Sequence, residues 1–323
     1  MLDPLPEKFL TSGMGKVAMT EKEALIALTS FVPFGPVRLN LLISYFGSAK
    51  ESWGAGHTVL ENIGLGKESL IRFLTYRRAF NLSRYLKNLR RLKIDVVTKG
   101  EKNYPQALTE IDSSPLLLYF KGNIKNLEPA LAIVGSRKMT PYGKEIAERF
   151  AMELASMGIC IISGLARGVD TTAHWGAIRA GGKTVAVLGC GLDTLYPPEN
   201  TKLAQEIVSL GGALISEYPL GYPPLKNNFP ARNRIISGLA KGVLVVEGAA
   251  RSGTLSTASQ AAEQGRAVFA VPGPIYSPNS AAPHFLLKNG AIPVTSLGDI
   301  LEEMGMDNVA SRGSNNIGVK AAT

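Results

Sequence analysis

The chain has 323 residues, 45% of them hydrophobic, which is enough for one large or two moderate domains with a buried core. No apolar run approaches the length that spans a bilayer, and the opening MLDPLPEKFL lacks the basic-then-apolar order of a secretory signal, so we expect a cytoplasmic protein. Two cysteines, Cys160 and Cys190, exclude a disulfide framework, and both lie in apolar runs where we expect small buried side chains.

The net charge of +9 is concentrated toward the N-terminus. Residues 1–105 carry 16 Lys and Arg against 9 Asp and Glu, whereas residues 106–323 carry 19 against 17. Much of the excess lies in YRRAFNLSRYLKNLRRLK, whose basic residues recur at helical spacing: Arg77, Arg78, Arg84, Lys87, Arg90, Arg91 and Lys93. Such a stripe is suited to phosphate, or it is simply a solvated helix face, and the sequence leaves both interpretations open.

Residues 20–100 are predicted to form a small all-α domain, preceded by a flexible leader at 1–19. From Thr20 to about Lys93 the apolar spacing is helical, with turn signals at PFGP and GLG. VPFGPVRLNLLISYFGS and LENIGLGKESLIRFL resemble helix-hairpin-helix units of a SAM-like domain. A hairpin turn of this kind can offer N–H groups to a phosphate. Because any α-hairpin needs a glycine turn, we interpret this pair as mainly structural.

Residues 101–306 are predicted to form an α/β domain. Six short, apolar, β-branched runs recur at intervals of about one βα unit: LAIVGS, CIISGL, TVAVLG, ALISEY, GVLVVEG and AVFAVPG. Amphipathic segments such as YGKEIAERFAMELASMG lie between them. This rhythm predicts an extended Rossmann-like, doubly wound, mostly parallel sheet, with PLLLYF as a flanking strand. The small polar residues of 307–323 predict a disordered tail.

The segments that follow these strands predict an anion-binding rim. Ligands of such sheets bind beyond the carboxyl ends of the strands. Here those ends supply glycines, hydroxyls, helix N-termini and five basic residues: Arg137, Lys226, Arg232, Arg234 and Arg251. Backbone N–H groups at helix N-termini and guanidinium groups both favour anions.

The sequence offers little sign of a catalytic or cofactor-binding site. It contains neither G-x-G-x-x-G after the first strand nor a P-loop, and its three histidines and two cysteines form no metal-ligand cluster, so we expect no cofactor, no metal and no catalysis. His174 follows Asp170 by four residues, either as an acid-base pair or as an N-terminal acid beside a histidine that fixes the loop. Glu217 and Glu247 end strands, either as paired acids or as groups that orient arginines and cap loop amides.

An ordered series of stretches resembles the DprA/Smf family, DNA processing protein A. The stretches are VGSR with TPYG, SGLARGVDTTAH, GGKTVAVLGCGLDTLYPPEN, ISEYPLG, FPARNRIISGLA, VVEGAARSGTLSTA and GRAVFAVPG. The resemblance covers roughly Tyr104 to Val294, and the helical front half is similar to the variable N-terminal extension of many members. After VPG this chain has SAAPHFLLKNG where members usually carry Gly-Thr-Asn, and we expect no winged-helix-like domain.

The resemblance implies a protein of natural transformation that binds and protects incoming single-stranded DNA, forms a homodimer through the α/β domain and loads RecA recombinase. The family's DNA-contact pattern falls on Arg137, Lys226 and Phe229. A cation can neutralise a phosphate while an aromatic ring stacks on any base, although Phe229 is alternatively a core residue. The remaining candidates for the rim are Gly135, Ser136, Ser163, Gly164, Arg232, Asn233, Arg234, Ser252 and Gly253.

Arg232 and Arg234 are expected at the start of a helix, where the N-terminus favours anions. Two residues apart on a helix, they cannot both face one phosphate, so we expect one of them to pair with Glu217 or Glu247.

An alternative function is a nucleotide-processing enzyme. EGAARSGT resembles in shape the Gly-Gly-x-Gly-Thr loop of the lysine-decarboxylase-like phosphoribohydrolases. Those enzymes are expected to carry P-G-G-x-G-T-x-x-E, whereas here the glutamate precedes the loop and Leu-Ser-Thr follows Thr254. Release of free base from nucleoside monophosphates would favour this alternative.

Overall fold

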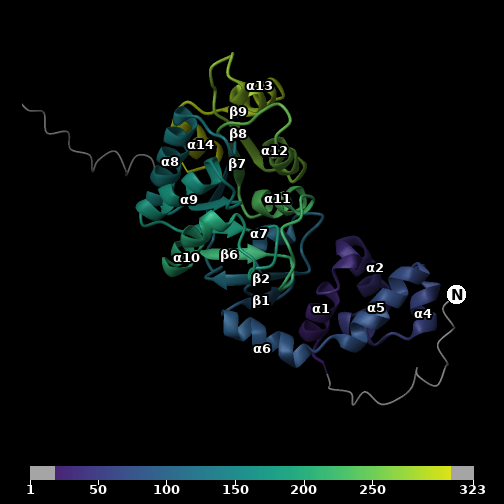
Figure 1. Ribbon diagram of the computed structural model, residues 1–323. Helices are drawn as coiled ribbons and strands as arrows, with labels where there is room; N and C mark the ends of the chain where they lie inside the picture. The colour runs from purple at the N-terminus through teal and green to yellow at the C-terminus, as the bar shows by residue number, and fades with distance from the viewer. Residues whose placement is uncertain (1–18, 307–323) are drawn as a thin grey trace, which may run out of the picture. The chain divides into compact units, whose positions relative to one another are not determined.

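The computed structural model describes residues 19–306, and the leader and tail expected at the two ends fall mainly outside this range. The chain divides into two compact units, one ending at Leu82 and the other beginning at Ser83. Figure 1 labels their helices and strands.

The first unit is entirely helical within its described residues, as predicted. Its helices are α1 (Glu21–Thr29), η2 (Val32–Phe34), α2 (Gly35–Phe46), α3 (Ala49–Gly54), α4 (His57–Asn62) and α5 (Lys67–Ala79). Thr20 and Glu23 form a capping box that starts α1. The core is aromatic: Phe34 and Phe73 are buried with ring centroids 4.7 Å apart, and Trp53 meets the Phe73 ring edge-on.

Arg77 departs from the predicted basic stripe. Its guanidinium Nη1 donates to the carbonyl oxygens of Trp53 and Ala55, at 2.7 and 2.8 Å, and so closes the C-terminal end of α3. Burial lowers the pKa of Arg77. Arg77 therefore has a structural role inside this unit, whereas Arg78, the next residue of the predicted stripe, is exposed.

Over residues 83–306, the second unit is built on one nine-stranded sheet. Its strands are β1 (Asp95–Thr98), β2 (Leu117–Gly122), β3 (Ala130–Val134), β4 (Cys160–Ser163), β5 (Thr184–Val187), β6 (Ala213–Ser216), β7 (Gly242–Val245), β8 (Ala267–Ala270) and β9 (Ile292–Pro293). The spatial order is β1-β2-β6-β5-β4-β3-β7-β8-β9. All pairs from β6 to β9 are parallel, whereas β2 is antiparallel to both β1 and β6. The predicted doubly wound, mostly parallel sheet is confirmed.

Helices cover both faces of this sheet, which is why its central strands are apolar on both sides. The helices of this unit are α6 (Leu82–Leu92), α7 (Gln106–Thr109), α8 (Pro141–Ser156), α9 (Val169–Arg179), η3 (Pro198–Asn200), α10 (Thr201–Ser209), α11 (Asn228–Gly238), α12 (Gly253–Glu263), η4 (Pro278–Ser280), α13 (Ala281–Lys288) and α14 (Leu297–Glu303). One core layer joins strand residues to α11 and α12, and the other joins them to α8, α9 and α14. Figure 1 shows these two groups of helices on opposite sides of the strands.

The six predicted runs overlap β3 to β8, and the last four residues of PLLLYF form the beginning of β2. Two short strands were not predicted, β1 and β9. The structure also groups α6 and β1 with the sheet, whereas the sequence placed them in the helical domain ending at residue 100. Tyr85 on α6 gives the reason, because its hydroxyl accepts from the N–H of Leu220 at 3.0 Å and donates to the Tyr119 hydroxyl at 3.2 Å.

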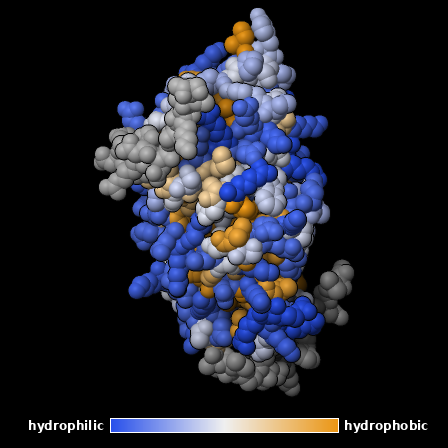
Figure 2. Space-filling model, turned by 90° about the vertical axis from the view of Figure 1, so that its left-hand side faces the viewer, coloured by the Kyte–Doolittle hydropathy of each residue, from blue (hydrophilic) through white to orange (hydrophobic). Residues whose placement is uncertain are grey.

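Within residues 19–306 no single helix is long and apolar enough to cross a membrane. The two helical segments Glu21–Thr29 and Val32–Phe46 reach the required length and apolar composition only when taken together, and they are bent relative to each other. Large exposed hydrophobic side chains occur in both units, for example Val37 and Tyr276. The face in Figure 2 is mainly hydrophilic, with hydrophobic residues in small patches.

Candidate nucleic-acid interface

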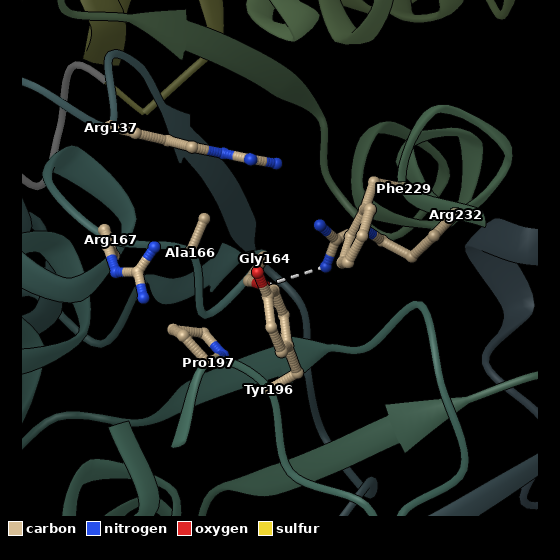
Figure 3. Close-up of a pocket in the computed structure, with 8 residues that line it drawn as sticks. All are labelled: Arg137, Gly164, Ala166, Arg167, Tyr196, Pro197, Phe229 and Arg232. Atoms are coloured by element: carbon tan, nitrogen blue, oxygen red, sulfur yellow. Dashed lines mark hydrogen bonds between the residues drawn. The ribbon is translucent and has the colours of Figure 1, made fainter. Parts of the chain in front are cut away.

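A shallow hollow, open to solvent, lies at the carboxyl ends of β3, β4 and β5. We call it the arginine hollow. Its lining comprises Arg137, Gly164, Ala166, Arg167, Tyr196, Pro197, Phe229 and Arg232 (Figure 3). The loops after three neighbouring strands meet the first turns of α11 here, which is the position where doubly wound sheets bind ligands.

Arg137 reaches the arginine hollow from the loop after β3. The backbone at Gly135 passes so close to α9 that a Cβ there would lie 2.6 Å from Val169, so only glycine fits. The loop then turns at Ser136, whose hydroxyl accepts from the N–H of Lys138 at 3.1 Å. Arg137 itself is exposed, and its guanidinium carbon lies 5.6 Å from the centre of the Phe229 ring.

Phe229 is half-buried and faces the arginine hollow, so it is not a residue of the hydrophobic core. Its ring centroid lies 5.7 Å from that of Tyr196, with the planes tilted by 42°. The neighbouring Asn228 is buried and donates to the carbonyl of Gly189 at 2.8 Å, which fixes the beginning of α11. Two aromatic rings and one guanidinium therefore share this wall, as Figure 3 shows.

Arg232 borders the same space but is 4% exposed. Its Nη1 donates to the carbonyl oxygens of Gly164, at 2.8 Å, and of Val187. A Cβ at Gly164 would lie 2.7 Å from both the Arg232 Nη2 and a carboxylate oxygen of Asp170, so glycine makes room for this pair. Burial lowers the pKa of Arg232 to about 10, which leaves the group charged at neutral pH, while burial raises the pKa of Asp170 against the effect of Arg232.

The expectation that Arg232 and Arg234 sit at the start of a helix is wrong, because α11 begins at Asn228, so both lie beyond its first residues. Arg234 does not line the arginine hollow. Its Nη1 and Nη2 donate to the two carboxylate oxygens of Glu217 at 2.8 and 2.6 Å, and its Nε donates to the carbonyl of Ser113. The expectation that one of the two arginines pairs with Glu217 is confirmed.

Arg167 was missed as a site residue although it lies in the quoted stretch SGLARG after β4. It is exposed, it lines the arginine hollow, and its Nε contacts the carboxylate of Glu199 in η3. The hydrogen bond from Arg167 lowers the pKa of Glu199. Tyr196, in the loop after β5, was missed too. The same strand-end reasoning that selected Arg137 would have found both residues.

The other predicted contact residues are spread around this edge of the sheet. Lys226 is exposed in the loop before α11 but does not line the arginine hollow. Ser163 is fully buried and donates to the carbonyl of Ile133 at 2.7 Å, so its hydroxyl is committed to the sheet. Asn233 is buried and donates to the carbonyl of Gly253 at 3.4 Å. The Ser252 hydroxyl oxygen is buried at the start of α12, where Gly253 is exposed.

The candidate acids serve structural roles. The Glu247 carboxylate accepts from the N–H and hydroxyl of Thr140, at 2.9 and 2.5 Å, and so ties the start of α8 to the end of β7. Asp170 accepts from the N–H groups of Gly164 and Ala166. No cluster of three metal-ligating side chains occurs among residues 19–306.

His174 is fully buried on α9, and its Nδ1 lies 2.7 Å from the Thr184 hydroxyl. That hydroxyl donates its proton to the carbonyl of Ile161, so the histidine must donate from Nδ1 and keep Nε2 unprotonated. Nε2 has no hydrogen-bond partner among residues 19–306, and burial lowers the pKa of His174 to about 3. The histidine is therefore a neutral structural group rather than an acid-base partner of Asp170.

Residues 95–305 match the family model described as DNA recombination-mediator protein A. The chain is 46% identical over 247 residues to the protein Smf of Escherichia coli, an alignment that covers 76% of this chain and 66% of that protein. It is 47% identical over 201 residues to the DNA processing protein DprA of Streptococcus pneumoniae, covering 62% of this chain and 71% of that one. The matched part thus spans just under two thirds of the first of these relatives.

Solved structures show the same fold. The X-ray structure of DNA processing protein A from S. pneumoniae superposes with a TM-score of 0.73 at 34% identity, covering 88% of this chain and 98% of that chain. A structure of DNA processing protein A from Helicobacter pylori, described by its single-stranded DNA binding mode, gives a TM-score of 0.60 at 30% identity. That alignment covers 67% of this chain and 97% of the other.

Proposed function

The chain belongs to the DNA recombination-mediator protein A family, also called DprA/Smf, and we propose that it binds single-stranded DNA at the arginine hollow. The observation that carries this proposal is the shared wall of Arg137, Tyr196 and Phe229, beside the guanidinium of Arg167. Cations that track a phosphate backbone, together with aromatic rings that stack on bases, are what a sequence-tolerant single-strand site requires. The H. pylori relative, described by its single-stranded DNA binding mode, supports the same assignment.

The hollow also favours a single strand over a duplex. Stacking on Phe229 or Tyr196 needs a base that is free of its partner and turned outward, and both rings line the hollow. Lys226, exposed in the loop before α11, and Gly253, exposed at α12, extend the same edge of the sheet and are proposed as outer contacts with the strand.

We test this proposal by fluorescence anisotropy with a labelled oligothymidine and a duplex of the same length, titrated with salt. The single strand should bind at least about fivefold more tightly, because one base–aromatic stack contributes about 1–3 kcal/mol. Affinity should fall steeply with salt as phosphate contacts release counterions. Equal affinity for the two DNA forms at moderate salt would contradict the assignment.

Three wider roles go with this family and are proposed for the chain: protection of incoming DNA in natural transformation in the cytoplasm, loading of RecA recombinase, and homodimer formation through the α/β unit. For the homodimer, candidate contacts are exposed apolar side chains in the loop after β8 and on α13: Ile275, Tyr276 and Phe285. We propose no catalytic step. The alternative of a phosphoribohydrolase gains no support, since Glu247, the glutamate beside its candidate loop, is engaged with Thr140.

A further inference from the structure

Glu199 forms an ion pair with Arg167, one of the arginines that line the arginine hollow. The Nε of Arg167 contacts the Glu199 carboxylate, and the side chains of the two residues are 56% and 48% exposed. In Figure 3 the remaining nitrogens of the Arg167 guanidinium extend from the Nε side toward the hollow, between Arg137 and Pro197. The pair joins the loop after β4 to η3 across the edge of the site.

The three arginines of the hollow differ in what neutralises them. Arg232 is buried, bound to two carbonyl oxygens and close to the Asp170 carboxylate, so its charge is largely committed. Arg137 is exposed and lies over the Phe229 ring. Of the three, Arg167 has a solvent-exposed carboxylate as its partner, so its charge is compensated by a group that can move away.

We propose that Glu199 acts as a resident counter-anion, which holds the phosphate-binding guanidinium of Arg167 until a DNA phosphate takes its place. This inference rests on the proposed function and deepens it. It adds Arg167 to the residues that contact DNA and makes Glu199 a built-in competitor of the ligand.

Replacing Glu199 by a phosphate at Arg167 costs the protein little free energy. Exposed ion pairs contribute little net stability, and a carboxylate that is already half in solvent regains its hydration when it is released. Guanidinium binds phosphate through two parallel N–H···O bonds, so the incoming group can replace the lost contact in kind. The Arg167–Glu199 pair keeps Arg167 extended toward the hollow as long as it is formed. It also lowers the net positive charge of the hollow, which weakens the attraction of small anions with a single charged group.

The test is a charge-neutralising replacement that keeps the shape of the acceptor. Glu199→Gln retains an amide oxygen for Arg167 but removes the negative charge. We expect the variant to bind oligothymidine about two- to fivefold more tightly than the parent, which is the size of effect expected for an exposed ion pair. We also expect its affinity to fall more steeply with salt, because no carboxylate recaptures a cation when the phosphate arrives.

Two controls isolate the pair. Glu302→Gln removes the same charge from an exposed position on α14 and should leave affinity unchanged. Arg167→Ala should weaken binding, and adding Glu199→Gln to it should restore much less affinity than the same replacement gains in the parent, because the competing contact is already gone. All variants are first compared by thermal unfolding, and we expect the melting temperature of Glu199→Gln to match that of the parent.

Each other outcome overturns the proposal. Weaker binding by Glu199→Gln would make Glu199 an orienting group for Arg167, and unchanged binding would remove its role. An equal gain with and without Arg167 would show general charge repulsion. These results arise while the parent binds single strands normally, whereas failure of the parent to bind them would overturn the proposed function and this inference together.

Discussion

Phe229 and Arg137 line the same hollow, yet they are expected to support binding through different physics. Phe229→Ala removes a stacking surface and should cost about 1–3 kcal/mol of binding free energy with little change in the salt dependence. Arg137→Ala removes a charge and should flatten the salt dependence by about one counterion-equivalent, and so should Lys226→Ala. Salt titrations of oligothymidine binding, read by anisotropy, measure both quantities.

Folding of these variants is the control, since Phe229 is half-buried and contacts Tyr196. If Phe229→Ala melts far below the parent, its loss of binding reports on stability. If Arg137→Ala binds single strands as the parent does, its assignment to the DNA surface is wrong.

His174 makes the stability of the protein depend on pH. Its pKa of about 3 in the folded state lies below the ordinary value of 6.5, so the unfolded chain takes up the proton first. The contribution of His174 is complete above about pH 6.5 and is lost as the pH falls toward 3, by about 1.4 kcal/mol for each pH unit. Urea unfolding between pH 7.5 and 5 measures this slope.

His174→Asn is the matched variant, because an amide can donate to the Thr184 hydroxyl but does not titrate in this range. Its free energy of unfolding should fall less steeply with acid than that of the parent, by up to about 1.4 kcal/mol for each pH unit. Identical slopes in the two proteins would show that His174 is protonated to the same extent in both states.

Residue types at the strand ends predicted much of the site. Arg137 could be selected as a basic residue in the polar segment after β3, whereas Phe229 came from the family's DNA-contact pattern, with a core position as the alternative. Ser163 could not be told from a surface hydroxyl, since its burial depends on a carbonyl of a strand distant in the sequence. The same holds for Arg232, whose partners Gly164, directly after β4, and Val187, the last residue of β5, are brought together only by the folded sheet.

At the scale of elements, β3 to β8 were predictable because strands buried on both faces are short, apolar and β-branched. The two-residue β9 lies below any recognisable pattern. β1 was missed for another reason. The sequence of α6 continues the pattern of the preceding helices, so the helical domain was extended to residue 100, beyond β1. Only contacts such as that of Tyr85 with Leu220 show that α6 belongs with the sheet.

This attachment predicts where the chain can be shortened. A chain that begins at Ser83 keeps β1 and all of α6 but its first residue, whereas one that begins at Glu101 loses the pairing of β1 with β2 and the buried Val97 side chain. We expect the shorter chain to be less stable by on the order of 3 kcal/mol, from the apolar surface that it exposes. Urea unfolding of the two chains tests this, and equal midpoints would show that α6 and β1 are dispensable.

At the scale of the whole molecule, the division into two units changes how the excess charge is assigned. The sequence places the excess in residues 1–105, but the units part at Leu82 and Ser83. Exposed basic residues of α6, among them Lys87, Arg90 and Arg91, therefore belong to the unit that carries the arginine hollow. A count along the sequence could not show this, since it depends on which core a helix packs against.

The short strand β9 also limits how copies of this protein can associate. An open sheet edge is a template on which another chain can add a strand by backbone hydrogen bonding, and this is a common route to aggregation. Here the strand beyond β8 has two residues, and Pro293 has no N–H to donate. Within the described part of the chain the sheet therefore ends at β9, so we expect copies that meet there to do so through side chains rather than through a continuous sheet.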